Sequence, residues 1–272
     1  MHRSTYYAAC QLPSNVVPLR REPVVPRGER TADLLDAMRK LAAEHPAFGY
    51  RKLWATLRRD GMRVAQRRVH ALCKAYGLSL TPDRPNRKPA PRGHVTVPEP
   101  NRRWATDLTT VWTDNDGLCA VTILVDCGDR FVLRLQVSKS QEAPTILAPV
   151  RSALREHFST PALVPSGLEL RTDHGPQYTG SDCEALCDQW RVQHTLAPVG
   201  RPTGNAVAER TIWTMKEECI WLADFVTISD LQAALDSWRE TFNNRRPHQA
   251  LKWQTPAKRR AERLAVPLPE AA

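Results

Sequence analysis

Residues 171–178 read Arg-Thr-Asp-His-Gly-Pro-Gln-Tyr, and residues 205–209 read Asn-Ala-Val-Ala-Glu, so that Asp173 and Glu209 have thirty-five residues between them. A third acidic residue, Asp107, lies upstream in the segment Trp-Ala-Thr-Asp-Leu-Thr. The chain has 29 Asp and Glu residues, and most acidic residues of any protein are solvated surface groups. Spacing alone therefore does not single out these three, and the sequence around each of them has to carry the interpretation.

Asp107 lies within a segment that has the composition of a β-strand. Residues 104–112 and 118–125 are rich in Val, Thr, Ile and Trp, and residues 131–137 supply a third strand, so the pattern predicts an antiparallel meander. A helix is expected to follow over residues 141–157, where apolar residues recur at helical spacing. A carboxylate in the middle of a strand costs free energy unless a cation compensates it. The position of Asp107 therefore favours a metal or cationic partner.

The other two acidic residues are also expected at positions that hold them firmly. Residues 168–172 read as a short strand that delivers Asp173 at its carboxyl end, and functional sites of α/β sheets collect outside such ends. Farther along, Asn205 is a plausible N-cap of a helix, which places Glu209 in the first turns of that helix, facing the sheet. All three acidic residues are thus expected to converge from distant points of the sequence.

Three converging carboxylates indicate a particular chemistry. Transfer of a phosphodiester requires stabilisation of an attacking and a leaving oxygen, which two Mg²⁺ or Mn²⁺ ions about 3.5–4 Å apart provide. Such hard cations select oxygen ligands. Asp107, Asp173 and Glu209 look like the metal-binding triad of a polynucleotidyl transferase, and we predict them as catalytic residues that hold two ions in the DNA-bound state. On the helix of Glu209, Arg210 and Lys216 are candidates for contacting phosphate, although Lys216 would also fit a solvated rim.

The distribution of charge points to nucleic acid by a separate route. Residues 1–100 carry 19 Lys and Arg against 8 Asp and Glu, a net charge of +11, whereas residues 101–272 carry 20 against 21, a net charge of −1. Clustered positive charge of this kind fits contact with DNA phosphates, and a solvated helix face is the alternative. The residues proposed to contact DNA in this part of the chain are Arg51, Lys52, Arg67, Arg68 and Lys74.

The basic region reads as a small helical domain. Amphipathic patterns predict helices over residues 33–42, 49–59 and 65–76, with Gly77 ending the third. The last two helices, joined by a short turn that contains glycine, resemble a helix-turn-helix, so the third helix is expected to face a DNA groove. Packing of this domain against the rest of the chain is the alternative interpretation.

Composition divides the chain into five parts. A Pro-rich opening without helical period is expected to be poorly ordered, and six prolines over residues 82–100 indicate an extended basic linker. Seven cysteines without a regular framework and the lack of a long apolar run indicate a reduced, cytoplasmic protein without a membrane span. The predicted parts are an N-terminal segment (1–30), a basic helical domain (31–80), a linker (81–100), a catalytic core (101–225) and C-terminal helices with a tail that pack on the core (226–272).

Several motifs together resemble one family. The segments around Asp107 and Asp173 and the run Gly-Arg-Pro-Thr-Gly-Asn-Ala-Val-Ala-Glu-Arg over residues 200–210 resemble the integrase core of insertion-sequence transposases. The run Phe-Asn-Asn-Arg-Arg-Pro-His that ends at His248 is similar to the closing signature of the second-frame product (OrfB) of the IS three family. The run His-Pro-Ala-Phe-Gly-Tyr-Arg-Lys-Leu that starts at His45 is similar to its helix-turn-helix region. The resemblance covers nearly the whole chain.

The resemblance implies an α/β fold with an RNase H-like mixed five-stranded sheet flanked by helices, preceded by a small all-α helix-turn-helix-like domain. It implies an Asp-Asp-Glu transposase that cleaves DNA at the ends of an insertion element in a Mg²⁺- or Mn²⁺-dependent reaction and transfers the strand to target DNA, by a copy-out route through a circular intermediate. The implied partners are the terminal inverted repeats, the target DNA, further copies of the chain on DNA and an upstream-frame (OrfA) polypeptide joined by frameshifting, in the cytoplasm and nucleoid of a bacterium.

Two other functions share part of this pattern. A DNA-binding regulator could use an integrase-like half only as a scaffold, although a scaffold has no need of three carboxylates at these positions. A nuclease of the RNase H type would need the same metals but no strand transfer. Formation of a joined DNA product separates a transposase from both.

Overall fold

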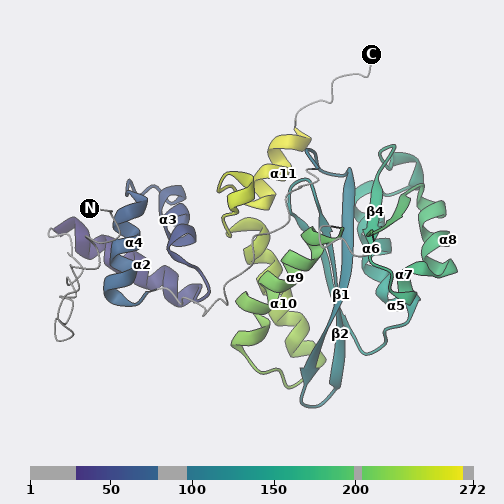
Figure 1. The fold of residues 1–272 in the computed structure, drawn as a ribbon, viewed down its shortest axis with the longest axis horizontal. Helices are drawn as coiled ribbons and strands as arrows, with labels where there is room; N and C mark the ends of the chain where they lie inside the picture. Colours follow the sequence, from purple (N-terminus) through teal and green to yellow (C-terminus); the bar gives the residue numbers. More distant parts are fainter. Residues whose placement is uncertain (1–28, 79–96, 199–203, 266–272) are drawn as a thin grey trace, which may run out of the picture.

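The computed structural model describes residues 29–78, 97–198 and 204–265. A helical domain lies on one side, and a larger α/β core lies on the other (Figure 1). The expected poorly ordered segment over residues 1–30 and the Pro-rich linker over residues 81–100 fall largely outside the described residues. No described helix has both the length and the apolar character that a membrane crossing demands.

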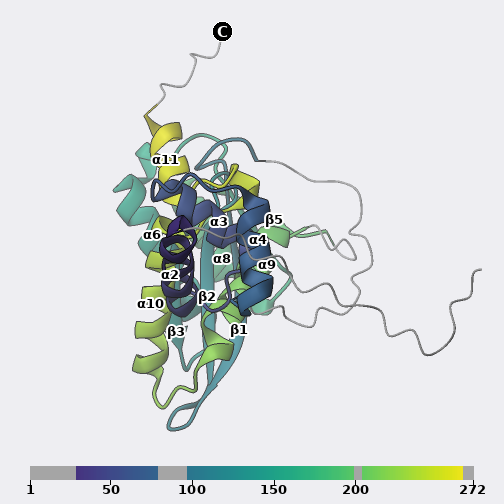
Figure 2. The same ribbon diagram turned by 90° about the vertical axis from the view of Figure 1, so that its left-hand side faces the viewer.

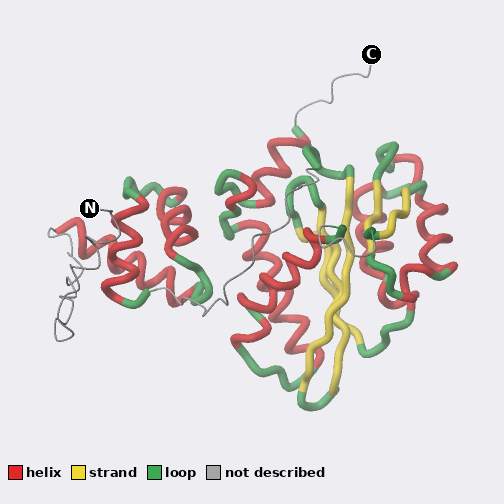
Figure 3. Tube along the Cα trace, viewed as in Figure 1, coloured by secondary structure: helices red, strands yellow, loops and turns green. Residues whose placement is uncertain are grey.

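The core is built on one five-stranded mixed sheet (Figure 3). Its strands, in spatial order β3-β2-β1-β4-β5, are β3 (Val132–Ser138), β2 (Gly117–Asp126), β1 (Arg103–Thr113), β4 (Glu169–Thr172) and β5 (Gln193–Leu196). The pairs β1–β2 and β2–β3 are antiparallel, which confirms the predicted meander, and the pairs β1–β4 and β4–β5 are parallel. The change from antiparallel to parallel pairing at β1 brings the carboxyl end of β4 next to the middle of β1.

Helices cover both faces of the sheet because the long strands alternate in their apolar residues. Trp104 and Leu108 of β1 face a cluster beneath α6 (Ala148–Phe158) and α8 (Ser181–Trp190). Ala105 and Val111 face the opposite cluster, beneath α9 (Ala206–Glu218) and α10 (Ile228–Asn244). Each face thus buries a separate apolar core, as expected of a three-layer α/β fold.

The helix expected over residues 141–157 is divided in two. A short helix α5 (Ala143–Ile146) ends at Leu147, and α6 begins directly after it with Pro149 in its first turn. Because proline has no N–H to donate to the preceding turn, the hydrogen-bond ladder is interrupted at this point. A short helix α7 (Pro176–Thr179) then follows β4, and the apolar side of α8 packs on the sheet.

The chain from residue 206 onward covers the second face of the sheet. It forms α9 (Ala206–Glu218), a 3₁₀ turn (Ile220–Leu222) and α10 (Ile228–Asn244), whose first turn is closed by a capping box between Thr227 and Asp230. A second 3₁₀ turn (Gln249–Leu251) leads to the last helix, α11 (Pro256–Leu264).

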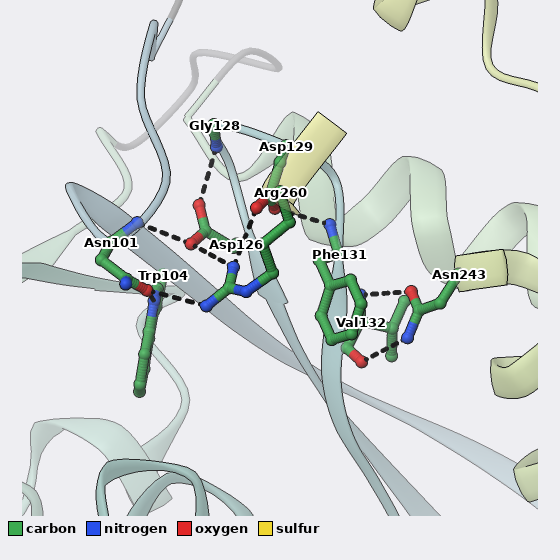
Figure 4. Close-up of polar contacts among 9 residues, drawn as sticks. All are labelled: Asn101, Trp104, Asp126, Gly128, Asp129, Phe131, Val132, Asn243 and Arg260. Atoms are coloured by element: carbon green, nitrogen blue, oxygen red, sulfur yellow. Dashed lines mark hydrogen bonds and ion pairs between the residues drawn. The ribbon is translucent and has the colours of Figure 1, made fainter. Parts of the chain in front are cut away.

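Buried polar contacts fasten this C-terminal region to the sheet (Figure 4). The Arg260 guanidinium of α11 bridges the carboxylates of Asp126 (3.1 Å) and Asp129 (2.9 Å), both of which have no exposed surface. On α10, the Asn243 amide donates to the Val132 carbonyl (3.0 Å) and accepts from the Val132 N–H (2.9 Å). These contacts hold α10 and α11 against the sheet.

The helical domain consists of α2 (Glu29–Glu44), α3 (Tyr50–Arg59) and α4 (Gln66–Tyr76), close to the three predicted helices. Viewed from its own side, this domain lies in front of the core (Figure 2). Its apolar residues form a small core of their own, and α4 ends at Gly77 in the left-handed conformation, as predicted.

The helical domain also contacts the core directly through α3. The Lys52 ammonium lies 2.5 Å from the Glu218 carboxylate of α9, and Arg59 donates to the Arg245 carbonyl at 2.6 Å. The ring of Trp54 packs edge-on against that of Trp253, with 6.0 Å between the ring centroids. The interpretation that this domain packs against the rest of the chain therefore has contacts in its favour, and these contacts leave the outer surfaces of α3 and α4 exposed.

Candidate active site

Asp107 lies in the middle of β1, opposite Ile123 of β2, on the face of the sheet that α9 covers. The side chain is half-buried, and its Oδ1 accepts a 2.8 Å hydrogen bond from the N–H of Leu108. Burial, with the negative charges of Asp173 and Glu209, raises the pKa of Asp107 to about 6. The charge effects show that the three predicted carboxylates lie within electrostatic reach of one another.

Asp173 follows the last residue of β4. The parallel register aligns Ala105 of β1 with Arg171 of β4, and two residues farther along the same alignment brings Asp173 beside Asp107 on one side of the sheet. The Oδ1 of Asp173 accepts a 3.0 Å hydrogen bond from the N–H of Gly175, which fixes the carboxylate at the turn into α7. The expected position at a strand end is what the structure shows.

Glu209 lies in the first turn of α9, the helix that packs on β1 and β2. Ala208, Ile212 and Met215 form the face of α9 that is buried against the sheet. Glu209 itself is exposed at the edge of this face, and its charge acts on Asp107 of β1. Partial burial and the charge of Asp173 raise its pKa. The third carboxylate thus approaches the other two from the helix side of an open rim.

The three carboxylates suit a hard divalent cation in their chemistry. Within the described residues, none of them forms an ion pair with a protein cation, and Asp107 and Glu209 both have raised pKa values, in which the charges of the neighbouring carboxylates take part. In the described part of the chain, no three acidic, His or Cys side chains lie close enough together to hold a metal ion as the structure stands. Mutually repelling oxygen donors that form no ion pair with a cation of the described residues are the donor set that Mg²⁺ or Mn²⁺ would relieve.

The structure places Arg210 and Lys216 on α9 near these acids. Lys216 is half-buried, and its positive charge lowers the pKa of Asp107, so its ammonium lies within electrostatic range of the candidate site. Arg210 is exposed and follows Glu209 directly. Both residues therefore remain candidates for holding a phosphate beside the three carboxylates.

The basic residues of the helical domain lie apart from the carboxylates and fall into two groups. Arg51, Arg67 and Lys74 are exposed on α3 and α4. In contrast, Arg68 is half-buried and donates to the Thr31 hydroxyl at 2.7 Å, and Lys52 is engaged with Glu218. The structure therefore gives Arg68 and Lys52 intramolecular partners in place of a free approach to DNA.

Sequence reasoning gave no role to two residues beneath the site and a different role to a third. Thr106 and Tyr178 are completely buried and share a 3.3 Å hydrogen bond between their hydroxyl groups. Asn205 occupies the N-cap position of α9, but its side chain makes no capping hydrogen bond and reaches across to β1 instead. Tyr178 is the residue that could have indicated such a contact from the sequence, because a phenol that becomes buried needs a hydrogen-bond partner.

Comparison with known proteins agrees with this geometry. Residues 29–86 match the HTH-like domain family, and residues 97–202 and 190–256 match two integrase core domain families. The Escherichia coli transposase InsD for insertion element IS2A/D/F/H/I/K is 29% identical over 238 residues, covering 82% of this chain and 77% of the relative.

A solved structure shows the same fold. A chain of the simian T-cell lymphotropic virus intasome in complex with a PP2A regulatory subunit is 20% identical and has a TM-score of 0.54, covering 86% of this chain and 78% of that one. The HTLV-2 integrase catalytic core domain in complex with magnesium is 16% identical with a TM-score of 0.45, covering 59% of this chain and 96% of that one.

A mixed five-stranded sheet with helices on both faces and an integrase core defines the molecule as an RNase H-like enzyme of the transposase and integrase class. More particularly, the chain belongs to the insertion-sequence transposases of the InsD type, the second-frame products of the IS three family, with a helix-turn-helix-like domain ahead of the integrase core. The integrase core implies DNA cleavage and strand transfer as its activity.

Proposed function

We propose that the chain cleaves DNA at the ends of an insertion element and joins the released 3′-hydroxyl to another phosphodiester, with Asp107, Asp173 and Glu209 holding two Mg²⁺ or Mn²⁺ ions. The observation that carries this proposal is the convergence of the three carboxylates, in which Asp173 and Glu209 raise the pKa of Asp107. Residues that only stabilise the fold gain nothing from such repulsion, whereas cation ligands are held ready by it.

The proposed role of each residue follows from the strand or helix that carries it. Asp107 and Asp173 present oxygens from adjoining strands of a rigid sheet, and Glu209 presents its carboxylate from α9. Bound divalent ions supply charge stabilisation for the attacking and the leaving oxygen. Lys216 and Arg210 hold the DNA phosphate against the carboxylates, because both are cationic and lie on the same helix, α9, as Glu209. Water and then the 3′-hydroxyl are the nucleophiles of the two steps.

The helical domain supplies contacts to DNA outside the active site. Arg51, Arg67 and Lys74 are exposed cations on α3 and α4, suited to the phosphates of a terminal inverted repeat. The proposal includes at least two copies of the chain on DNA, because each active site acts on one strand at a time. It also includes an upstream-frame polypeptide that adds end recognition, and action on the bacterial nucleoid, where the element and target DNA lie.

A branched DNA that imitates the strand-transfer product tests the proposal and requires no end recognition. We expect the purified chain with Mn²⁺ to resolve this DNA into separate strands, and Glu209→Gln to abolish the reaction. Glu217→Gln is the matched control, because Glu217 lies in the last turn of the same helix and should leave the rate unchanged.

The same experiment separates the other functions. DNA binding without resolution by the parent chain, unaffected by Glu209→Gln, would favour a regulator. Nicking without any joined product would favour a nuclease. Resolution that survives in Glu209→Gln would remove Glu209 from the site.

A further inference from the structure

Asn205 connects the backbone of Glu209 to the strand of Asp107. Its main-chain carbonyl accepts a 3.1 Å hydrogen bond from the N–H of Glu209. Its side-chain Nδ2 donates a 3.0 Å hydrogen bond to the carbonyl of Thr106, the residue directly before Asp107 on β1. The residue is buried, with 4% of its surface exposed. One side chain therefore sets the position of the start of α9 against the middle of β1.

Thr106 extends this connection to the third carboxylate. Its side chain points to the opposite face of the sheet from Asp107, where its hydroxyl meets that of Tyr178 on α7. The turn that leads into α7 is the one held by the hydrogen bond of Asp173 to Gly175. Burial raises the pKa of Tyr178, and the charges of Asp107 and Asp173 raise it further. The phenol therefore lies within electrostatic range of both carboxylates.

Only one of the two polar ends of the Asn205 amide has a hydrogen-bond partner among the described residues. Its Oδ1 is buried and has no hydrogen-bond partner in the described part of the chain. The orientation of the amide is fixed, since the Thr106 carbonyl can accept only from the NH₂ end. An apolar side chain would avoid the unpaired buried acceptor, but it would also remove the hydrogen bond from Nδ2 that ties the start of α9 to β1.

We propose that Asn205, Thr106 and Tyr178 form a buried positioning chain that holds the three carboxylate-bearing segments in register for the divalent cations. This inference rests on the proposed function. The three residues are positioning residues, because their contacts run to one another and to the backbone beneath the site and not to the reacting atoms. Loss of any link lets one carboxylate move relative to the other two, which weakens cation binding before it weakens the fold.

The test uses the full chain bound to the branched DNA, titrated with Mn²⁺. Tyr178→Phe and Thr106→Val each remove one hydroxyl with little change in shape, and Asn205→Ala removes the amide. We expect the Mn²⁺ concentration at the midpoint, read both from the rise in melting temperature and from the resolution rate, to increase about tenfold in each variant. The rate at saturating Mn²⁺ and the affinity for DNA should stay close to those of the parent chain.

A double-mutant cycle sharpens the assignment. Because Tyr178→Phe and Thr106→Val break the same hydrogen bond, the double variant should shift the midpoint no more than either single variant does. Tyr178→Phe combined with Asn205→Ala breaks two separate links, so these shifts should multiply. Full multiplication in the first pair would contradict a shared link.

Asn243→Ala is the matched control. Asn243 is also a buried asparagine that ties a helix to a strand by its amide, but it holds α10 to Val132 at the far side of the core. It should lower the melting temperature without moving the Mn²⁺ midpoint. If the positioning variants move the midpoint no more than Asn243→Ala does, the positioning chain is refuted even when Glu209→Gln abolishes the Mn²⁺ response. If the parent chain has no Mn²⁺ response, or Glu209→Gln keeps it, the proposed function itself fails.

Discussion

Two groups of three carboxylates in the core differ in how their charge is met. One group is buried against guanidinium side chains: Asp126 and Asp129 at Arg260, and Glu218 at Arg246 with 2.8 Å between Nε and Oε2. The other group, at the candidate site, consists of Asp107, Asp173 and Glu209 and has no ion pair to a protein cation among the described residues. Both groups lie on the same sheet and the helices that cover it. The fold therefore places arginine side chains beside one group of carboxylates and not beside the other.

The difference teaches how a structural acid can be told from a functional one. Breaking a buried ion pair leaves an uncompensated charge and costs about 3–5 kcal/mol, so structural carboxylates are tied to the arginines beside them. Carboxylates that repel one another at an open rim contribute nothing to folding, and their negative field remains available to a ligand. The sign of a substitution's effect on stability should therefore differ between the two groups.

The largest expected effect is on catalysis and comes from the unpaired group. Asp107→Asn should lower the resolution rate of branched DNA by at least about 10³-fold, because a neutral amide replaces a negatively charged carboxylate ligand of the cations. Without metal, the same variant should be as stable as the parent chain or more stable, since repulsion from Asp173 and Glu209 is relieved. Urea unfolding in EDTA measures this, and a loss of more than about 2 kcal/mol would place Asp107 with the structural acids.

The next effect concerns stability and comes from the paired group. Arg260→Met should cost about 3–5 kcal/mol in the free energy of unfolding, because Asp126 and Asp129 would be left buried without a cation. Arg263→Met on the same helix, where the side chain is exposed, is the control and should change little. Urea denaturation of the parent chain and of both variants measures the free energy of unfolding. Equal values would show that the buried ion pairs of Arg260 add nothing to stability.

Glu218 of the paired group and Asp107 of the candidate site should respond to pH with opposite sign. Burial alone would raise the pKa of Glu218, but Arg246 and Lys52 outweigh it and lower that pKa below its usual 4.5. The stability that Glu218 contributes is thus fully present above pH 4.5 and is lost as the pH falls through its lowered folded-state value. Glu218→Gln should cost about 3 kcal/mol at pH 7, and the gap to the parent chain should close in acid.

At the candidate site, Asp107 has a raised pKa, so its folded form takes up a proton more readily than its unfolded form between about pH 6 and 4. Its unfavourable contribution is present above pH 6 and disappears as the pH falls. Any stability advantage of metal-free Asp107→Asn should therefore shrink between pH 7 and pH 4. A stability advantage of Asp107→Asn that grew as the pH fell would contradict a raised pKa of Asp107.

The smallest effect tests the contact between the two domains. Lys52→Met should cost only about 1 kcal/mol, because Glu218 keeps its pairing with Arg246 when the lysine is lost. Lys40→Met, an exposed lysine on α2, serves as the control. Chemical denaturation monitored by tryptophan fluorescence measures both, and a cost as large as that of Arg260→Met would mean that Glu218 depends mainly on the helical domain.

Much of the fold follows from local patterns in the sequence. Enrichment in Val, Thr, Ile and Trp predicted the meander of β1, β2 and β3, and helical periodicity predicted the three helices before residue 78. The short strand β5 was not located, because Gln193–Leu196 has no apolar run and its residues stay partly exposed. Strand β5 exists because β4 offers it a parallel partner, which is a property of the assembled sheet.

The candidate site was predictable to a similar degree. Asp107 and Asp173 stood out because a strand and a strand end hold them, and Glu209 because a helix start follows a glycine-containing loop. The cross-links beneath them could not be read in advance. Asn205 looked like a local helix cap, and only the packing of α9 on β1 turned its amide toward Thr106, 99 positions away.

The bridge from Arg260 to Asp126 spans 134 positions of the chain and has a consequence for synthesis. The ribosome delivers the two aspartates long before it delivers the arginine that neutralises them. A nascent chain released early, by a stop codon or a shift in reading frame before α11, carries two buried acids without their cation. The last helix should therefore make stability depend on full-length translation, because a copy that lacks it has no Arg260 to neutralise Asp126 and Asp129.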